Sequence, residues 1–164
     1  SEFQPVSPKL VARTVTVKIP LGPLPPLEEL KTRADKSWLI EDLIERLERG
    51  EKPESLKDYK ITTWARGDDL AMVFLSDEVV VDYVLRMKQE FDGSRLWVSA
   101  YTHDVSTYIV STRLFDEGGY EVRNSLSNLV TFGQPQQLKP AIEDLIISTV
   151  GDMLPESFQR KNDL

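Results

Sequence analysis

The sequence predicts an α+β fold in which an antiparallel sheet carries two helices on one face. Several segments alternate apolar and polar residues, as half-buried strands do. Between them, apolar residues recur every three or four positions, as in amphipathic helices. In the first hundred residues these segments follow the order strand, helix, strand, strand, helix, strand, which is typical of two split β-α-β units. We therefore expect a four-stranded sheet with both helices on the same side.

The first strand is predicted at residues 10–19, because valine and isoleucine alternate there with small or polar residues. It ends at a connector, residues 20–26, which contains four prolines and suits neither a helix interior nor a central strand. A helix is expected within residues 27–50. Its apolar spacing is strongest from Trp38, and Gly50 is a stop signal.

A hairpin, a second helix and a fourth strand are predicted next. Residues 59–65 and 70–75 are short runs rich in β-branched and aromatic side chains, so we expect them to pair. Ser76 is placed to cap a helix that ends at residues 92–94. Residues 96–101 alternate again and predict the last strand of the sheet.

The remaining residues predict a C-terminal extension. Residues 106–114 and 120–132 are strand candidates on either side of a glycine turn, so we expect a second hairpin. After Pro140 an apolar stripe predicts a third helix. Pro155 begins a polar tail.

The predicted organisation has four parts. Residues 1–8 form a tag or disordered leader, since the first three residues have the look of a cloning scar. Residues 9–102 form the β-α-β-β-α-β core. Residues 103–154 form the hairpin and helix that pack on the core, and residues 155–164 a flexible tail. We expect this chain to be part of a larger protein.

The stretch from about residue 11 to 101 resembles the RNA-recognition-motif family. The resemblance rests on residues 15–18 at the shorter ribonucleoprotein motif, residues 70–75 at the longer one, and residues 91–98 at the start of the last strand. It covers a little over half of the chain. It implies the ferredoxin-like βαββαβ fold, with one sheet face free of helices.

The chain departs from the family where RNA-binding members stack bases. Those members present aromatic rings on the first and third strands. The matching positions here hold Thr16, Leu70 and Met72, and Asp68 replaces the usual basic residue. The standard stacking platform is therefore absent. Strand alternation instead places on this face the three rings of Trp64, Trp97 and Tyr101.

Two interpretations of this apolar face remain open. In the first, residues 103–164 fold back over the face and bury it as core, because large apolar side chains gain about 1.5–3 kcal/mol each when they leave water. In the second, part of the face stays exposed and binds a partner, since exposed apolar patches of this size mark interaction sites.

Composition excludes several classes of chemistry. The chain has 164 residues, no cysteine and one histidine, so cysteine-ligated zinc, iron–sulfur clusters and multi-histidine metal sites are excluded. A net charge of −7 argues against affinity gained mainly from a nucleic-acid backbone. No apolar run is long enough to span a membrane.

Short motifs give no enzyme signature. Residues 67–69, Gly-Asp-Asp, resemble a polymerase metal turn, but the neighbouring strand at residues 10–19 holds no acid to complete a two-metal site. Residues 66–68 spell a chance integrin-type tripeptide. His103 has only an adjacent Asp104 and no nucleophile. We expect no enzymatic activity, no cofactor and no metal.

These observations predict an intracellular module for protein–protein assembly, built on an RNA-recognition-motif-like fold and set within an RNA-related complex. A protein is the expected partner, and no membrane is expected to bind. The candidate contact residues lie on the sheet face: Thr16, Lys18, Lys60, Trp64, Leu70, Met72, Trp97 and Tyr101.

Two alternatives are retained. In one, the chain binds single-stranded RNA through Trp64, Trp97, Lys18 and Lys60, with rings for stacking and cations for phosphates. In the other, the chain is a structural protein, for example a viral one, that associates with copies of itself.

Overall fold

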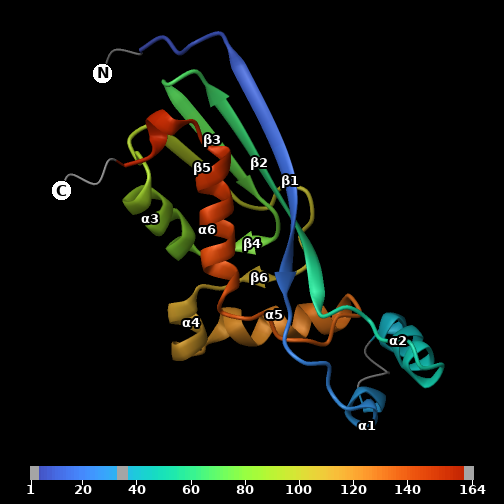
Figure 1. Cartoon of the computed structure of the whole chain (residues 1–164). Coiled ribbons are helices and arrows are strands. Elements are labelled where there is room, and N and C mark those ends of the chain that lie inside the picture. The colour runs from blue at the N-terminus through green and yellow to red at the C-terminus, as the bar shows by residue number, and fades with distance from the viewer. Residues whose placement is uncertain (1–3, 33–36, 161–164) are drawn as a thin grey trace.

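The centre of the molecule is a mixed four-stranded sheet. A computed structural model describes residues 4–32 and 37–160. Within them, β1 (Leu10–Pro20), β2 (Leu56–Arg66), β3 (Leu70–Leu75) and β5 (Leu96–Ser99) lie in the order β1-β2-β3-β5 (Figure 1). The first three strands are antiparallel, and β5 runs parallel to β3. The predicted α+β class and all four sheet strands are confirmed.

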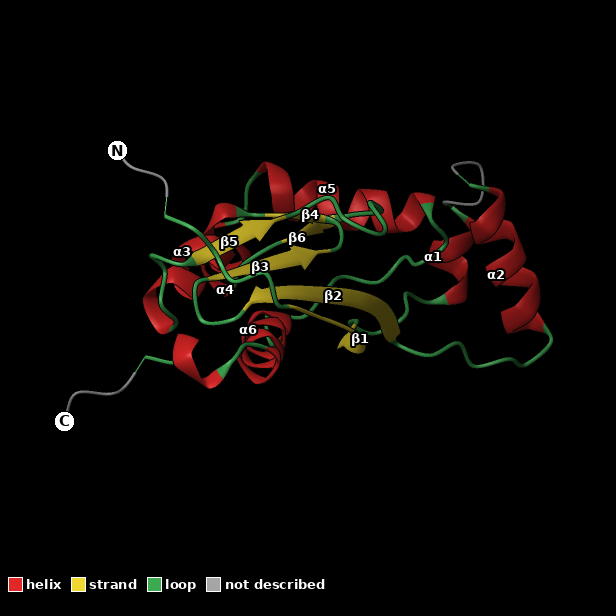
Figure 2. Cartoon of the chain, turned by 90° about the horizontal axis from the view of Figure 1, so that it is seen from above, coloured by secondary structure: helices red, strands yellow, loops and turns green. Residues whose placement is uncertain are grey.

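The ferredoxin-like strand order is wrong. That order would separate β1 from β2, whereas these strands pair along their whole length, from Leu10 opposite Arg66 to Pro20 opposite Leu56. The residues between them form α1 (Leu27–Lys31) and α2 (Trp38–Glu48), which lie beyond one end of the sheet (Figures 1 and 2). The first predicted helix is therefore an insertion in a long hairpin, not a crossover.

The insertion has a small core of its own, which explains why it does not pack on the sheet. Its apolar residues pack against α5 (Tyr120–Thr131). Ser37 caps α2, accepting a hydrogen bond from the amide of Leu39, and its hydroxyl also donates to the carbonyl oxygen of Thr131 at 2.9 Å. The buried members of this cluster are Leu30, Ile40, Leu43, Ile44 and Val130.

The main core lies between one face of the sheet and two helices, α3 (Val81–Glu90) and α6 (Ile142–Met153). The helix α6 lies beside β1 and β2 (Figure 2). Tyr59 and Tyr83 are fully buried there, and their hydroxyls donate to the carbonyl oxygens of Ser76 and Val110. Every polar group of these rings is thus paired inside the core, as burial requires.

The predicted C-terminal hairpin is wrong. Residues 106–132 contain only the two-residue strand β6 (Tyr108–Ile109), which pairs in parallel with β4 (Glu78–Val79), and then two helices, α4 (Thr112–Glu117) and α5. Ser111 starts α4 by accepting a hydrogen bond from the amide of Leu114. A short apolar run fits a helix as well as a strand, and the cap by Ser111 favours the helix at α4.

Two other boundaries differ from the predictions. Ser76 does not cap a helix, because Asp77 has a φ of +62° and β4 follows before α3 begins at Val81. The third predicted helix is confirmed as α6. After it, Glu156–Phe158 forms a 3-10 turn and Phe158 is buried, so the first part of the predicted tail packs on the core. The last four residues lie outside the described chain.

None of the described helices is long and apolar enough to cross a membrane.

Candidate interaction surface

The sheet has one covered face and one face without a helix in the described chain. Along β2 the odd-numbered residues, such as Tyr59 and Ile61, enter the core, and the even-numbered ones point to the other side. Both α3 and α6 contribute to the same core, so they lie on the same side. Figure 2 looks onto the open face: no described helix lies in front of the four strands, and α6 lies on their far side, beside β1 and β2.

A row of side chains crosses all four strands on the open face. Ala12 lies opposite Trp64, Trp64 opposite Met72, and Met72 opposite Trp97. Trp64 and Trp97 are 43% and 62% exposed. Phe74 packs edge to face against Trp64, with ring centroids 4.8 Å apart. We name the open-face patch by its six large apolar members: Leu10, Trp64, Leu70, Met72, Phe74 and Trp97.

Of the two interpretations of this face, burial under residues 103–164 is not seen among the described residues, because α6 packs on the opposite face. The loop after β5 reaches the open side. Thr102 donates hydrogen bonds to the carbonyl oxygen of Leu75, and the Nε2 atom of His103 lies 3.1 Å from Oγ1 of Thr62. Thr62, which also contacts the hydroxyl of Thr14, is 7% exposed. The loop thus borders the open-face patch without covering Trp97.

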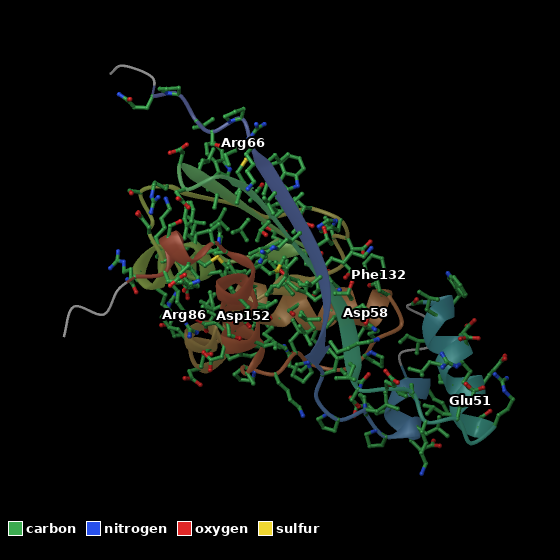
Figure 3. The ribbon with its side chains drawn as sticks, turned by 45° about the horizontal axis from the view of Figure 1, so that its top comes forward. Glu51, Asp58, Arg66, Arg86, Phe132 and Asp152 are labelled. Atoms are coloured by element: carbon green, nitrogen blue, oxygen red, sulfur yellow. The ribbon has the colours of Figure 1, made fainter. Side chains whose placement is uncertain are left out.

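The predicted cations lie at the other end of the open face. Thr16 is opposite Lys60, and Lys18 forms a 2.6 Å ion pair with Asp58 on β2. The hydrogen bond and charge of Asp58 raise the pKa of Lys18 above its ordinary value. Figure 3 labels Asp58 and Arg66 near the two ends of β2. Thr16, Lys18 and Lys60 therefore lie on the same face as Trp64, but outside the open-face patch.

Tyr101 leaves this surface, although its spacing placed it beside Trp97. Its φ is +59°, and its amide donates to the carbonyl oxygen of Asp77. A hydrogen bond to Glu78 raises the pKa of the Tyr101 phenol. The ring therefore belongs to the β4 side of the molecule.

A buried ion pair that the sequence analysis missed holds the bordering loop in place. The Nζ atom of Lys57 lies 2.9 Å from a carboxylate oxygen of Asp77, whose side chain is fully buried. The other oxygen of Asp77 accepts from the amide and hydroxyl of Ser106 and from the amide of Thr107. The one sequence signal was Lys57, a cation at a position where the alternation of β2 faces the core.

A concave site of about 280 Å³ lies between β4, β6 and the two helices α3 and α4. Glu78, Tyr101, Tyr108 and Arg113 are among its lining residues. Hydrogen bonding to Tyr120, burial and hydrogen bonding to Glu78 raise the pKa of Tyr108 to about 12. Its phenol is thus neutral at neutral pH and can donate or accept hydrogen bonds.

This pocket was missed because residues 106–132 were expected to form strands. Arg113 is already neutralised there by Asp82 at 2.9 Å and Glu117 at 2.7 Å. The hydrogen bonds of Arg113 and Ser111 hold the pKa of Asp82 below its ordinary value.

The acidic turn at residues 67–69 is structural. A carboxylate oxygen of Asp68 accepts from the hydroxyl of Ser157 at 2.6 Å, and one of Asp69 accepts from the amide of Ser7 at 2.8 Å. In the described ranges no three histidine, aspartate or glutamate side chains are grouped so that they could hold a metal ion.

Comparison with known proteins adds no relative: no family model, no curated protein and no solved structure matches the chain.

Proposed function

We propose that this chain is a protein-interaction module and that the open-face patch binds a protein partner. The observation that carries the proposal is the row of Trp64, Met72 and Trp97, which crosses the sheet with both indoles exposed and no helix over them in the described chain. Tryptophan and methionine are enriched in the cores of protein interfaces. A buried indole at the centre of an interface often dominates its binding energy.

The charges of the open face favour a protein over RNA. Single-stranded RNA binding combines stacking rings with cations that contact phosphates. Lys18, one of the two lysines expected to serve this role, is paired with Asp58. Arg66 donates to the carbonyl oxygen of Pro8. The net charge of −7 further weakens attraction to a polyanion.

The proposed role is assembly, which needs binding and no chemical step. As in RNA-recognition motifs, an exposed sheet face would serve as the contact surface, although the strand order here differs from theirs. Single-stranded RNA binding and self-association are the alternatives that the experiment must separate.

Capture from a native extract tests the proposal with a matched control. Trp97→Ser removes an exposed indole from the patch, and Trp38→Ser removes one that is 73% exposed on α2, away from the sheet. We expect proteins that the wild type and Trp38→Ser chains retain but the Trp97→Ser chain loses. Equal capture by all three chains would contradict the proposal.

Two further measurements address the alternatives. Titration with a labelled single-stranded RNA pool at low and moderate salt should show no salt-sensitive binding. Binding that Trp64→Ala and Lys60→Ala both abolish would favour RNA as the ligand. A concentration-dependent dimer that Trp97→Ser dissociates would instead favour self-association.

A further inference from the structure

The strand β1 forms one edge of the sheet, and the alternation of its hydrogen bonds shows which backbone groups face outward. The amide of Ser76 donates to the carbonyl oxygen of Lys60, so even-numbered residues of β2 bond to β3 and odd-numbered ones bond to β1. Since Val17 is opposite Tyr59, the odd-numbered residues of β1 bond to β2. The amide of Leu21, which donates to Ser55, continues the same alternation.

The outer edge of β1 is therefore made by the amides and carbonyls of its even-numbered residues. Within residues 4–32 and 37–160 no backbone group bonds to those of Ala12, Thr14, Thr16 or Lys18. The edge runs along the outside of the sheet (Figure 3). Prolines and β-bulges commonly protect edge strands from pairing with another chain. β1 contains no proline before Pro20 and no bulge.

One end of this edge already accepts an added backbone. The carbonyl oxygen of Pro20 accepts from the amide of Lys139 at 3.2 Å, and the amide of Gly22 donates to the carbonyl oxygen of Gln137 at 2.6 Å. Leu21 and Leu138 form an antiparallel bridge between these bonds. Pairing stops there because the chain turns at Pro140 into α6. The chain itself thus shows that the edge is competent for strand addition.

A pocket of about 250 Å³ lies beside the free part of the edge, on the helix side of the sheet. We name it the edge pocket; its lining includes Lys9, Val11, Arg13, Ala65, Met153 and Pro155. Ala65 and Met153 are buried and give it an apolar floor. In an added strand every second side chain points to this side of the sheet and can enter the edge pocket.

Two cations line the edge pocket without an ion pair among the described residues. Arg13 makes one long contact, 3.4 Å from its Nη1 to the carbonyl oxygen of Met153, and Lys9 is joined to no carboxylate. The nearby carboxylate of Asp68 already accepts from Ser157. Lys9, which directly precedes β1, and Arg13 are four residues apart and both line the edge pocket, a spacing that carboxylates on an incoming strand could match.

We propose that the free edge of β1 binds an extended segment of a protein partner as an added strand. The segment alternates apolar residues with carboxylates, and the carboxylates reach Lys9 and Arg13 in the edge pocket. Backbone bonds to the even-numbered residues supply affinity, and the edge pocket supplies specificity. A second copy of β1 is a poor occupant, because Leu10–Pro20 contains Arg13 and Lys18 but no acidic residue. The proposal concerns the edge and goes beyond the function proposed for the open face.

Fluorescence anisotropy with a labelled synthetic peptide tests this site. The labelled peptide alternates valine and threonine and carries two glutamates four positions apart. It is titrated with the whole chain. We expect saturable binding that weakens at least about tenfold when lysines replace the glutamates. Arg13→Glu should reverse this preference, so that the lysine peptide binds more tightly than the glutamate peptide. If Arg13→Glu unfolds the chain, Lys9→Glu provides the same test, because Lys9 lies outside the strands. We expect the same reversed preference for the lysine peptide.

Backbone methylation of the peptide provides the matched control. Methyl groups on alternate peptide nitrogens block the bonds to β1 in one register and point to solvent in the other, so only one of two such peptides should lose binding. Absence of saturable binding, equal loss with both methylated peptides, or binding indifferent to Arg13→Glu and Lys9→Glu would overturn the proposal. A dimer of the chain that Thr16→Pro dissociates would overturn the choice of occupant.

Discussion

The two faces of the sheet are built from alternate residues of the same strands, yet they differ in how their aromatic side chains are used. On the covered face Tyr59 is fully buried and its hydroxyl is paired. On the open face Trp64 and Trp97, which are larger and more apolar, stay in contact with water. The difference shows that the location of helices, not the residue type, decides which face becomes core.

The largest loss of stability is expected when the ion pair that fixes the loop beside the open face is removed. Asp77→Ala leaves Lys57 buried without a counter-charge and frees the amides of Ser106 and Thr107. We expect a loss of about 3–5 kcal/mol in the free energy of unfolding, measured in urea. The double variant Lys57→Met with Asp77→Leu should recover part of it. A loss below about 1 kcal/mol for Asp77→Ala would contradict this assignment.

A pair of substitutions on one strand tests the two faces directly. Ile61→Ala opens a cavity under α6 and should cost about 2–5 kcal/mol of unfolding free energy. Trp64→Ser, three residues along β2, loses mainly its edge-to-face contact with Phe74 and should cost about 0.5–1.5 kcal/mol. Similar losses for both variants in chemical denaturation would show that the open face is covered in solution.

Trp97→Ser should change stability least among the ring substitutions. Its side chain is mostly exposed at the edge strand β5, so we expect a change within about 0.5 kcal/mol. Thermal unfolding of this variant beside wild type provides the measurement. A large destabilisation would show that Trp97 is buried in solution.

The pH dependence of stability tests an ion pair of α3, the helix that packs on the covered face. Asp82 has a folded pKa held below 3.8, its ordinary value, by hydrogen bonds from Arg113 and Ser111. Its contribution is therefore present above the unfolded pKa and is lost as pH falls through the folded pKa. Asp82→Asn should remove at most about 1 kcal/mol at neutral pH and flatten the fall in stability below about pH 4. If urea unfolding shows the same fall in stability at low pH for Asp82→Asn and wild type, the prediction is contradicted.

Local patterns predicted the four strands of the central sheet well, because apolar and polar residues alternate along each of them. β3 begins and ends at the expected residues, and β1 and β2 differ from expectation only at their ends. Their alternation also placed Trp64, Met72 and Trp97 correctly on one face.

Pairing and cover could not be predicted in the same way. The helical spacing within residues 27–50 is the same for a crossover helix and for an insertion that packs on α5. Residues 120–131 carry a weak apolar pattern, and the left-handed backbone of Gly118 and Gly119 separates two helices there instead of two strands. The outward turn of Tyr101 depends on Asp77, whose burial no local pattern reveals.

The helical insertion between β1 and β2 has a core separate from the main one, so we expect it to unfold as a cooperative unit of its own. Its core has five buried residues, and it meets α5 at a close contact where Gly133, with a φ of +75°, leaves room for Leu39. Such a small cluster opens more readily than the main core. Amide hydrogens of α2 should therefore exchange with solvent well before those of β2, so that the hairpin can lose its distal lobe while its strands stay paired.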